Sequence, residues 1–163
     1  LIAEREGVAP EQVMLGDGSG EILRIAALAF SGPGRAVVAA RPTFTFLQDY
    51  ARLLGAPVRE VPLDAALRHD LAALEAALAA DTGLLYVCNP NNPTGTLVPG
   101  PEIRPFVSRA SRRAPVIVDE AYLDLWEDAP EHSCAPQVRA GEQVVVTRTF
   151  SKLHALAGLR IGY

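Results

Sequence analysis

Lys152 is the strongest candidate in this sequence for covalent chemistry. It follows an apolar run typical of a buried strand, Val144 to Thr147, and its neighbours are hydroxyls and small apolar residues. A lysine is usually a solvated surface charge, but desolvation and nearby cations lower the pKa of an amine and favour its neutral form. A neutral amine condenses with a carbonyl compound to give a Schiff base. The surroundings of Lys152 therefore favour Schiff-base chemistry over a surface role.

A second group of residues could bind an anion. The segment Gly16–Glu21, Gly-Asp-Gly-Ser-Gly-Glu, lies between a predicted strand and a predicted helix. Glycines let the backbone approach a ligand closely, the first N–H groups of a helix are free to bind an anion such as phosphate, and Ser19 adds a hydroxyl. The alternative is a flexible turn in which Ser19 caps the helix. The acidic residues of the turn add negative charge, so a phosphate needs a cation such as Arg160, whose guanidinium can bind it with two hydrogen bonds.

The segment Cys88–Gly95 contains two prolines in Asn-Pro-Asn-Asn-Pro-Thr-Gly. Proline fixes φ and pushes the preceding residue towards extended geometry, so such a loop should hold Asn92 rigidly. A rigid side-chain amide suits a directed hydrogen bond to a ligand. An ordinary Asn/Pro turn is the alternative, and the pattern alone does not identify a ligand.

Asp119 ends another apolar run, Val116 to Asp119, and Tyr122 follows three residues later. A carboxylate at the end of a buried strand is costly unless a cation or several donors satisfy it. Asp119 could instead cap a helix or bind a metal, but no suitably spaced His or Cys accompanies it, and no metal is expected. Asp119 and Tyr122 together predict a polar ligand that meets a carboxylate and a phenol.

Strands and helices alternate in the predicted secondary structure. Short apolar runs favour strands buried on both faces at 13–15, 36–40, 84–88, 116–119 and 144–147, with a weaker candidate at 58–63. Helical patterns occupy 20–30, 44–54, 70–79 and 102–112, and Asp70 is the expected N-cap of the third. This alternation predicts an α/β fold of three layers, α/β/α, around a mostly parallel central sheet.

Three polar clusters directly follow predicted strands: Asn89–Gly95, Asp119–Tyr122 and Thr149–Lys152. In parallel sheets ligands bind beyond the carboxyl ends of the strands. The clusters are therefore expected to converge on one edge of the sheet.

The composition is that of a folded protein without a basic surface. The chain has 163 residues, of which 49% are hydrophobic and 21% charged, and its formal net charge is -4. Nucleic acid and anionic membranes are therefore poor candidates for partners. The two cysteines do not form a disulfide scaffold, and no signal peptide or membrane-spanning run is present, so a cytoplasmic location is expected. The missing initiator Met and the apolar run at 159–163 predict a piece of a longer chain.

Taken together, these motifs resemble the fold-type-I, pyridoxal-phosphate-dependent aminotransferases of classes I and II, closest to the histidinol-phosphate aminotransferase branch. The match runs from the glycine turn through the Asn/Pro loop and Asp-Glu-Ala-Tyr at 119–122 to Arg-Thr-Phe-Ser-Lys and Ala-Gly-Leu-Arg-Ile-Gly-Tyr within 148–163. Their order and spacing are far more specific than any one motif. The resemblance implies that residues 1–163 are the cofactor-binding large domain of a homodimeric enzyme, without its N-terminal segment and its smaller C-terminal domain.

The resemblance also implies a role for each site residue. Lys152 would bind pyridoxal 5'-phosphate covalently and act as general base, and Asp119 would pair with the pyridine nitrogen. Asn92 and Tyr122 would contact the ring O3′, and Tyr122 would be catalytic together with Lys152 and Asp119. The ring would stack on Phe44, and the phosphate would be held by Ser19, Gly20, Thr149, Ser151 and Arg160.

The implied reaction moves an amino group between an amino acid, or an amino-alcohol phosphate such as histidinol phosphate, and a 2-oxo acid. A decarboxylase acting on threonine phosphate is the enzymatic alternative, because its relatives share this core. A non-catalytic regulatory domain of the same fold is the second alternative, and the presence of both Lys152 and Asp119 counts against it. Efficient transamination by these residues alone is not expected.

Three positions depart from the resemblance. Relatives often have Asn where Asp17 stands and Asp where Gly20 stands, and Asp17 adds repulsion towards a phosphate. Phe44 keeps the stacking surface of the more usual tyrosine but lacks its hydroxyl. His154 lies close to Lys152 in sequence and is expected to line the site or pack beside it.

Overall fold

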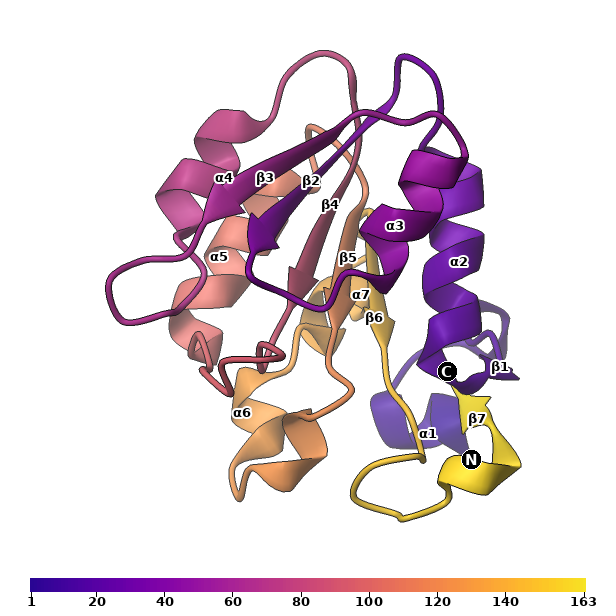
Figure 1. Ribbon diagram of the computed structural model, residues 1–163. Coiled ribbons are helices and arrows are strands. Elements are labelled where there is room, and N and C mark those ends of the chain that lie inside the picture. The colour runs from indigo at the N-terminus through magenta and orange to yellow at the C-terminus, as the bar shows by residue number, and fades with distance from the viewer.

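Five parallel strands form the sheet at the centre of the computed structural model, which describes residues 1–163 (Figure 1). Their order across the sheet is β3-β2-β4-β5-β6. They are β2 (Ala36–Arg41), β3 (Val58–Pro62), β4 (Thr82–Cys88), β5 (Val116–Asp119) and β6 (Val144–Thr147). The parallel sheet predicted from the sequence is confirmed, and the weaker strand candidate is its edge strand β3.

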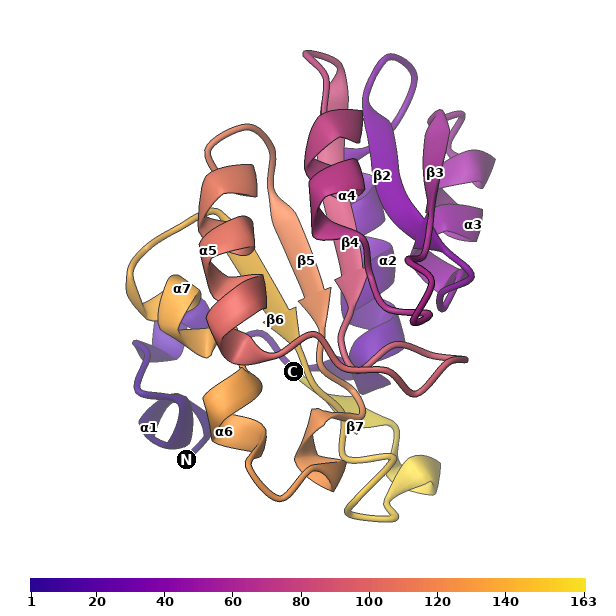
Figure 2. The same ribbon diagram turned by 90° about the vertical axis from the view of Figure 1, so that its left-hand side faces the viewer.

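Helices cover both faces of the sheet and complete the three layers (Figure 2). One face carries α2 (Gly18–Phe30) and α3 (Phe46–Leu53). The other carries α4 (Leu71–Ala77), α5 (Gly100–Ala110) and α7 (Ala135–Arg139). The expected N-cap of α4 is confirmed, since Asp70 Oδ1 accepts a hydrogen bond of 2.9 Å from the Ala73 amide.

The sheet separates two hydrophobic cores, and alternation along the strands assigns residues to each. In β4, Leu85 and Val87 belong to the core beneath α4 and α5, whereas Leu84 and Tyr86 belong to the core beneath α2 and α3. All four side chains are fully buried. A strand buried on both faces has no polar side to show, which is why the sequence displays continuous apolar runs rather than alternating ones.

Shorter elements lie near the carboxyl ends of the strands (Figure 1). They are α1 (Ile2–Glu6), η1 (Pro10–Gln12), β1 (Gly16–Asp17), η2 (Leu123–Leu125), α6 (Ala129–His132), η3 (Ala157–Leu159) and β7 (Ile161–Gly162). β1 and β7 pair in an antiparallel, two-stranded sheet of their own, with Gly16 opposite Gly162. None of the helices is both long and apolar enough to cross a membrane.

The strand expected at 13–15 is wrong. These residues form no strand, and Met14 and Leu15 are 45% and 64% exposed. The segment lies outside the central sheet, so its apolar side chains find no partner strand there, and the only pairing nearby is made by the two residues of β1. A short apolar run does not reveal whether a partner strand exists.

Candidate active site

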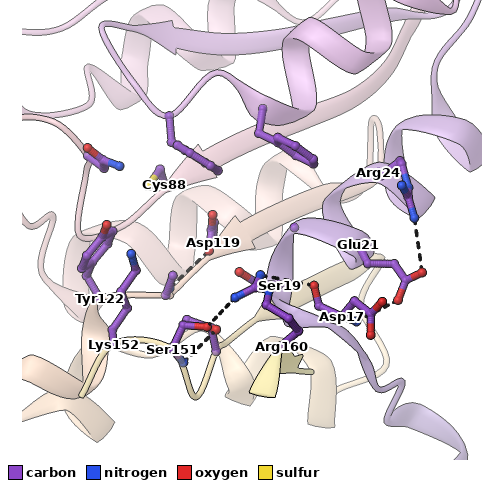
Figure 3. Close-up of a pocket in the computed structure, with 16 residues that line it drawn as sticks. Asp17, Ser19, Glu21, Arg24, Cys88, Asp119, Tyr122, Ser151, Lys152 and Arg160 are labelled. Carbon is purple, nitrogen blue, oxygen red and sulfur yellow. Dashed lines mark hydrogen bonds and ion pairs between the residues drawn. The ribbon is translucent and has the colours of Figure 1, made fainter. Parts of the chain in front are cut away.

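A cavity of about 390 Å³ lies at the carboxyl ends of β4, β5 and β6 (Figure 3). Every site residue expected from the sequence lines it: Ser19, Gly20, Phe44, Asn92, Asp119, Tyr122, Thr149, Ser151, Lys152 and Arg160. The predicted convergence of the polar clusters on one edge of the sheet is therefore observed. The cavity also has lining residues that the sequence did not single out as site residues, among them Arg24, Phe46 and Cys88.

Asp119 is the buried charge of this cavity, and its side chain is only 2% exposed. Oδ1 accepts hydrogen bonds from Thr147 Oγ1 at 3.0 Å and from the Ala121 amide at 3.2 Å, and Oδ2 accepts one from the Tyr86 hydroxyl at 3.1 Å. Burial raises the pKa of Asp119, while the three donors and the charge of Lys152 oppose that rise. Because a carboxylate oxygen can accept two hydrogen bonds, Oδ2 keeps room for a donor from a ligand.

Glu120 lies on the opposite face of the sheet, because successive strand residues point in opposite directions. Its Oε2 accepts a hydrogen bond of 2.9 Å from Arg148 Nη2 and one of 2.9 Å from Ser133 Oγ. Glu120 and Arg148 are 2% and 6% exposed, so this is a buried ion pair. Sequence reasoning missed it. It could have been predicted, because Asp119 and Thr147 end neighbouring strands and the next residues, Glu120 and Arg148, therefore lie side by side.

The Asn/Pro loop uses two of its three asparagines for its own structure. Asn89 accepts a hydrogen bond of 2.8 Å from the Val98 amide, and Asn91 accepts one of 2.6 Å from Thr43 Oγ1. Both asparagines are buried. Asn92 is partly exposed and lines the cavity, so its amide is the one available to a ligand.

The glycine turn and the segment around Arg160 are joined by the β1–β7 ladder. The Gly18 amide donates to the Arg160 carbonyl at 3.0 Å, and Arg160 Nη1 donates to Ser151 Oγ at 3.1 Å. Figure 3 shows the guanidinium beside Ser19 in the first turn of α2. The cation that the sequence required for an anion site therefore lies at the free N–H groups of that helix.

Ser19 is not the helix cap, so the alternative interpretation of the turn is not observed. The N-cap is Asp17, whose side chain makes no capping hydrogen bond. Glu21 instead folds back, and its Oε2 accepts a hydrogen bond of 2.8 Å from the Asp17 amide. Its Oε1 pairs with Arg24 at 3.3 Å, which partly compensates the acidic charge near the turn. Arg24 could have been predicted from the sequence as a cavity residue, because it lies one helical turn beyond Gly20 and so on the same face of the helix.

Lys152 is exposed, contrary to the desolvated setting expected from its neighbours in sequence. The chain leaves the sheet after β6 and crosses the surface in turns and η3 before it returns at β7, so residues 152–161 are exposed throughout. The amine nevertheless has a defined place. Nζ lies 4.9 Å from the centroid of the Tyr122 ring, a cation–π contact, and Figure 3 shows it on the same side of the cavity as Asp119.

The two hydroxyls expected at a phosphate are already part of the loop structure. Thr149 Oγ1 accepts a hydrogen bond of 3.1 Å from the Ser151 amide, and Ser151 Oγ accepts the one from Arg160. Both residues line the cavity. Their hydroxyls therefore order the loop and the guanidinium as well as facing any ligand.

An aromatic wall forms another side of the cavity. The Phe44 ring is stacked with that of Phe46, with centroids 6.2 Å apart and planes inclined by 9°. Phe44 is 37% exposed, which leaves ring surface available to a flat ligand. The arrangement thus offers a flat apolar wall, an amine, a buried carboxylate and a cation beside a helix N-terminus.

Comparison with known proteins finds relatives along almost the whole chain. A family model described as aminotransferase class I and II matches residues 2–163. The histidinol-phosphate aminotransferase of Moorella thermoacetica is 40% identical over 163 residues, which are 99% of this chain and 42% of that protein. The histidinol-phosphate aminotransferase of Geobacillus thermodenitrificans is 41% identical over 162 residues, which are 99% of this chain and 44% of that protein.

A solved structure shows the same fold with a ligand. The histidinol-phosphate aminotransferase of Sinorhizobium meliloti, in complex with pyridoxal-5'-phosphate, superposes with a TM-score of 0.78 at 26% identity, covering 99% of this chain and 44% of that chain. This chain spans less than half the length of the curated relatives it matches.

The two adjacent buried carboxylates should respond oppositely to neutralisation. We expect Asp119→Asn to raise the free energy of unfolding of the ligand-free chain by about 1 kcal/mol at neutral pH, because the charge is buried among neutral donors. We expect Glu120→Gln to lower it by roughly 3 kcal/mol, because Arg148 loses its buried counter-ion. Chemical denaturation of the three proteins measures both effects.

The pH dependence gives a second check on Asp119. Its folded-state pKa is raised by burial, so the folded protein binds a proton more readily than the unfolded chain. Stability is therefore gained as the pH falls through the folded pKa, and the advantage of Asp119→Asn should shrink on acidification. An Asp119→Asn protein less stable than the parent at neutral pH would contradict this account.

Gly18→Ala should destabilise the glycine turn from which α2 begins. Gly18 has a φ of 70°, and a Cβ there would collide with the Arg160 guanidinium. We expect the free energy of unfolding to fall by about 1–3 kcal/mol. Gly158→Ala is the matched control, since a Cβ at Gly158 meets no atom within 4 Å. Equal effects of the two substitutions in thermal unfolding would show that the turn is not constrained in this way.

Proposed function

Because this chain belongs to the class I and II aminotransferase family, we propose that its cavity binds pyridoxal 5'-phosphate and that the enzyme moves an amino group between an amino donor and a 2-oxo acid. One observation carries the proposal: the amine of Lys152 and the buried carboxylate of Asp119 line one cavity with Arg160. These are the partners required by an aldehyde, a ring nitrogen and a phosphate, respectively.

The chemical donors of the cavity fit such a ligand. Oδ2 of Asp119 has one donor, Tyr86, and so keeps a lone pair that would accept a hydrogen bond from a protonated ring nitrogen and hold that proton in place. Arg160 and the free amides of Ser19 and Gly20 bind a phosphate dianion. Phe44 covers one face of the ring. Pyridoxal phosphate supplies an aldehyde that reacts with amines and a protonated ring that draws electrons from the substrate α-carbon.

Lys152 performs the covalent and proton-transfer work. Its Nζ would hold the cofactor through the aldehyde and, when not so engaged, would be a base beside the substrate. Placed beside the substrate α-carbon, a neutral Nζ would accept the α-proton and could later give it back. The contact of Nζ with the Tyr122 ring restricts the amine to this side of the cavity. Tyr122 and Asn92, which line the same cavity, would donate hydrogen bonds to the ring O3′.

The amino donor is proposed to be histidinol phosphate or a similar amino-alcohol phosphate. The support is the printed function of the curated relatives that are 40% and 41% identical to this chain. Assembly as a homodimer, which the family resemblance implies, and a cytoplasmic location are proposed as well. Two free, buried thiols, Cys88 and Cys134, are compatible with a reducing compartment.

Covalent trapping tests the cofactor proposal directly. Lys152 is the only lysine in the sequence, so the N-terminus of Leu1 is the only other primary amine. We expect pyridoxal phosphate to produce a new visible absorbance band and borohydride reduction to attach one cofactor mass to Lys152, located by peptide mass spectrometry. Lys152→Arg keeps the charge beside Tyr122 and should abolish the label. A label confined to Leu1 would overturn the site.

Product analysis distinguishes the aminotransferase from the decarboxylase alternative. With stoichiometric cofactor-loaded chain, histidinol phosphate should yield a carbonyl compound with an unchanged carbon count, because the bond broken at the α-carbon is to hydrogen. The products of a single turnover are measured by mass spectrometry. Release of carbon dioxide from threonine phosphate, with no carbonyl product from histidinol phosphate, would favour the decarboxylase.

A further inference from the structure

Tyr86 is a buried polar residue next to the proposed site that the proposed function leaves without a role. It lies on β4 within the core beneath α2 and α3 and is completely buried. Its hydroxyl donates to Asp119 Oδ2 at 3.1 Å, and it does not line the cavity. A hydroxyl inside an apolar core is costly unless it is hydrogen-bonded, so its position calls for an explanation.

The register of the sheet explains how Tyr86 reaches Asp119. Tyr86 is paired with Ile117, and Cys88 is paired with Asp119, so Tyr86 and Asp119 are diagonal neighbours on one face of the sheet. A tyrosine is long enough to bridge such a diagonal. The phenol thus approaches the carboxylate from the core, on the side away from the ligand space.

The two oxygens of Asp119 have different surroundings as a result. Oδ1 is satisfied by the Thr147 hydroxyl and the Ala121 amide, both of which lie at strand ends. Oδ2 has Tyr86 as its single donor within the chain. Oδ2 is therefore the oxygen with a remaining lone pair for a ligand, and Tyr86 is the group that decides where that lone pair points.

We propose that Tyr86 is a positioning residue which, through its hydrogen bond to Oδ2, keeps Asp119 ionised and directs its free lone pair at the ring nitrogen of the cofactor. This inference rests on the proposed function. Phenols are good donors to carboxylates, and a donor to the charged form stabilises that form. Without the hydroxyl, burial alone would act on Oδ2, and Asp119 would take up a proton more readily.

Two other titratable groups near Asp119 stay neutral in the acidic and neutral range. On β4, burial raises the pKa of Tyr86 well above its usual value and that of Cys88 to about 12, so both stay neutral. Beyond β6 the facing cation is Lys152, and beyond β5 the facing phenol is Tyr122. Thr147 on β6 does not titrate. We therefore assign a change of charge in this cluster on mild acidification to Asp119 itself.

The test compares two ligands that differ only at the ring nitrogen. Dissociation constants for pyridoxal phosphate and for its 1-deaza analogue, in which carbon replaces that nitrogen, are measured on the full chain over a pH series. The ratio of the two constants reports the contact between Asp119 and nitrogen and cancels effects on the phosphate. The ratio is the dissociation constant of the 1-deaza analogue divided by that of pyridoxal phosphate. In the parent chain it should exceed one at neutral pH and fall on acidification, as Asp119 becomes protonated.

Tyr86→Phe removes the hydroxyl and keeps the ring. We expect the fall of the ratio to begin about one pH unit higher, so that in the intervening range the preference for pyridoxal phosphate is about tenfold smaller. Tyr50→Phe is the matched control, because Tyr50 packs against the same core and does not line the cavity. In an Asp119→Asn background, Tyr86→Phe should leave the ratio unchanged.

Several outcomes would overturn the inference. Coincident pH profiles for Tyr86→Phe and the parent would do so, and so would an equal loss of affinity for both ligands, which indicates packing alone. If Tyr86→Phe does not fold, 3-fluorotyrosine placed at position 86 supplies a stronger donor and should move the fall to lower pH; no movement refutes the inference. Failure of the parent chain to label at Lys152 would instead refute the proposed function.

Discussion

The Asp119 carboxyl group is only 2% exposed, and the structure around the cavity depends on how this buried group finds its hydrogen-bond partners. Three neutral donors meet it from separate parts of the sheet: Tyr86 from β4, Thr147 from β6 and the Ala121 amide just beyond β5. Parallel pairing sets Thr147 directly beside Asp119 and puts Tyr86 at the diagonal position on the other neighbouring strand, from which its hydroxyl reaches the carboxylate. The cost of burying the charge is thereby reduced without placing a counter-ion where a ligand must bind.

The neighbouring Glu120 shows the other solution to the same problem. It is as buried as Asp119 but faces away from the cavity, where Arg148 neutralises it. Strand alternation thus sends one carboxylate to the ligand and the next into an ion pair that ties β5 to β6. The ion pair joins the residues that directly follow β5 and β6, next to Asp119 at the end of β5. It leaves the charge of Asp119 free for a cation brought by the ligand.

Much of the site could be predicted because its residues occur in short segments directly after strands. Parallel strands end at one edge, so Asn92, Asp119 and Lys152 had to approach one another once the strands were identified. Tyr86 could not be identified in this way, because in sequence it is one more apolar residue of a buried strand. The error at 13–15 has a related cause, since an apolar run reveals nothing about a partner strand.

The sequence by itself determined the order of strands and helices, the polar clusters at the strand ends and the family to which their spacing belongs. Only the tertiary structure decided which oxygen of Asp119 remains open, that Arg160 reaches the first turn of α2 through the β1–β7 ladder, and that Lys152 stands exposed beside Tyr122. The reason is physical: local spacing follows from the periodicity of one chain segment. Hydrogen-bond partners and exposure depend on contacts between segments that are distant in sequence.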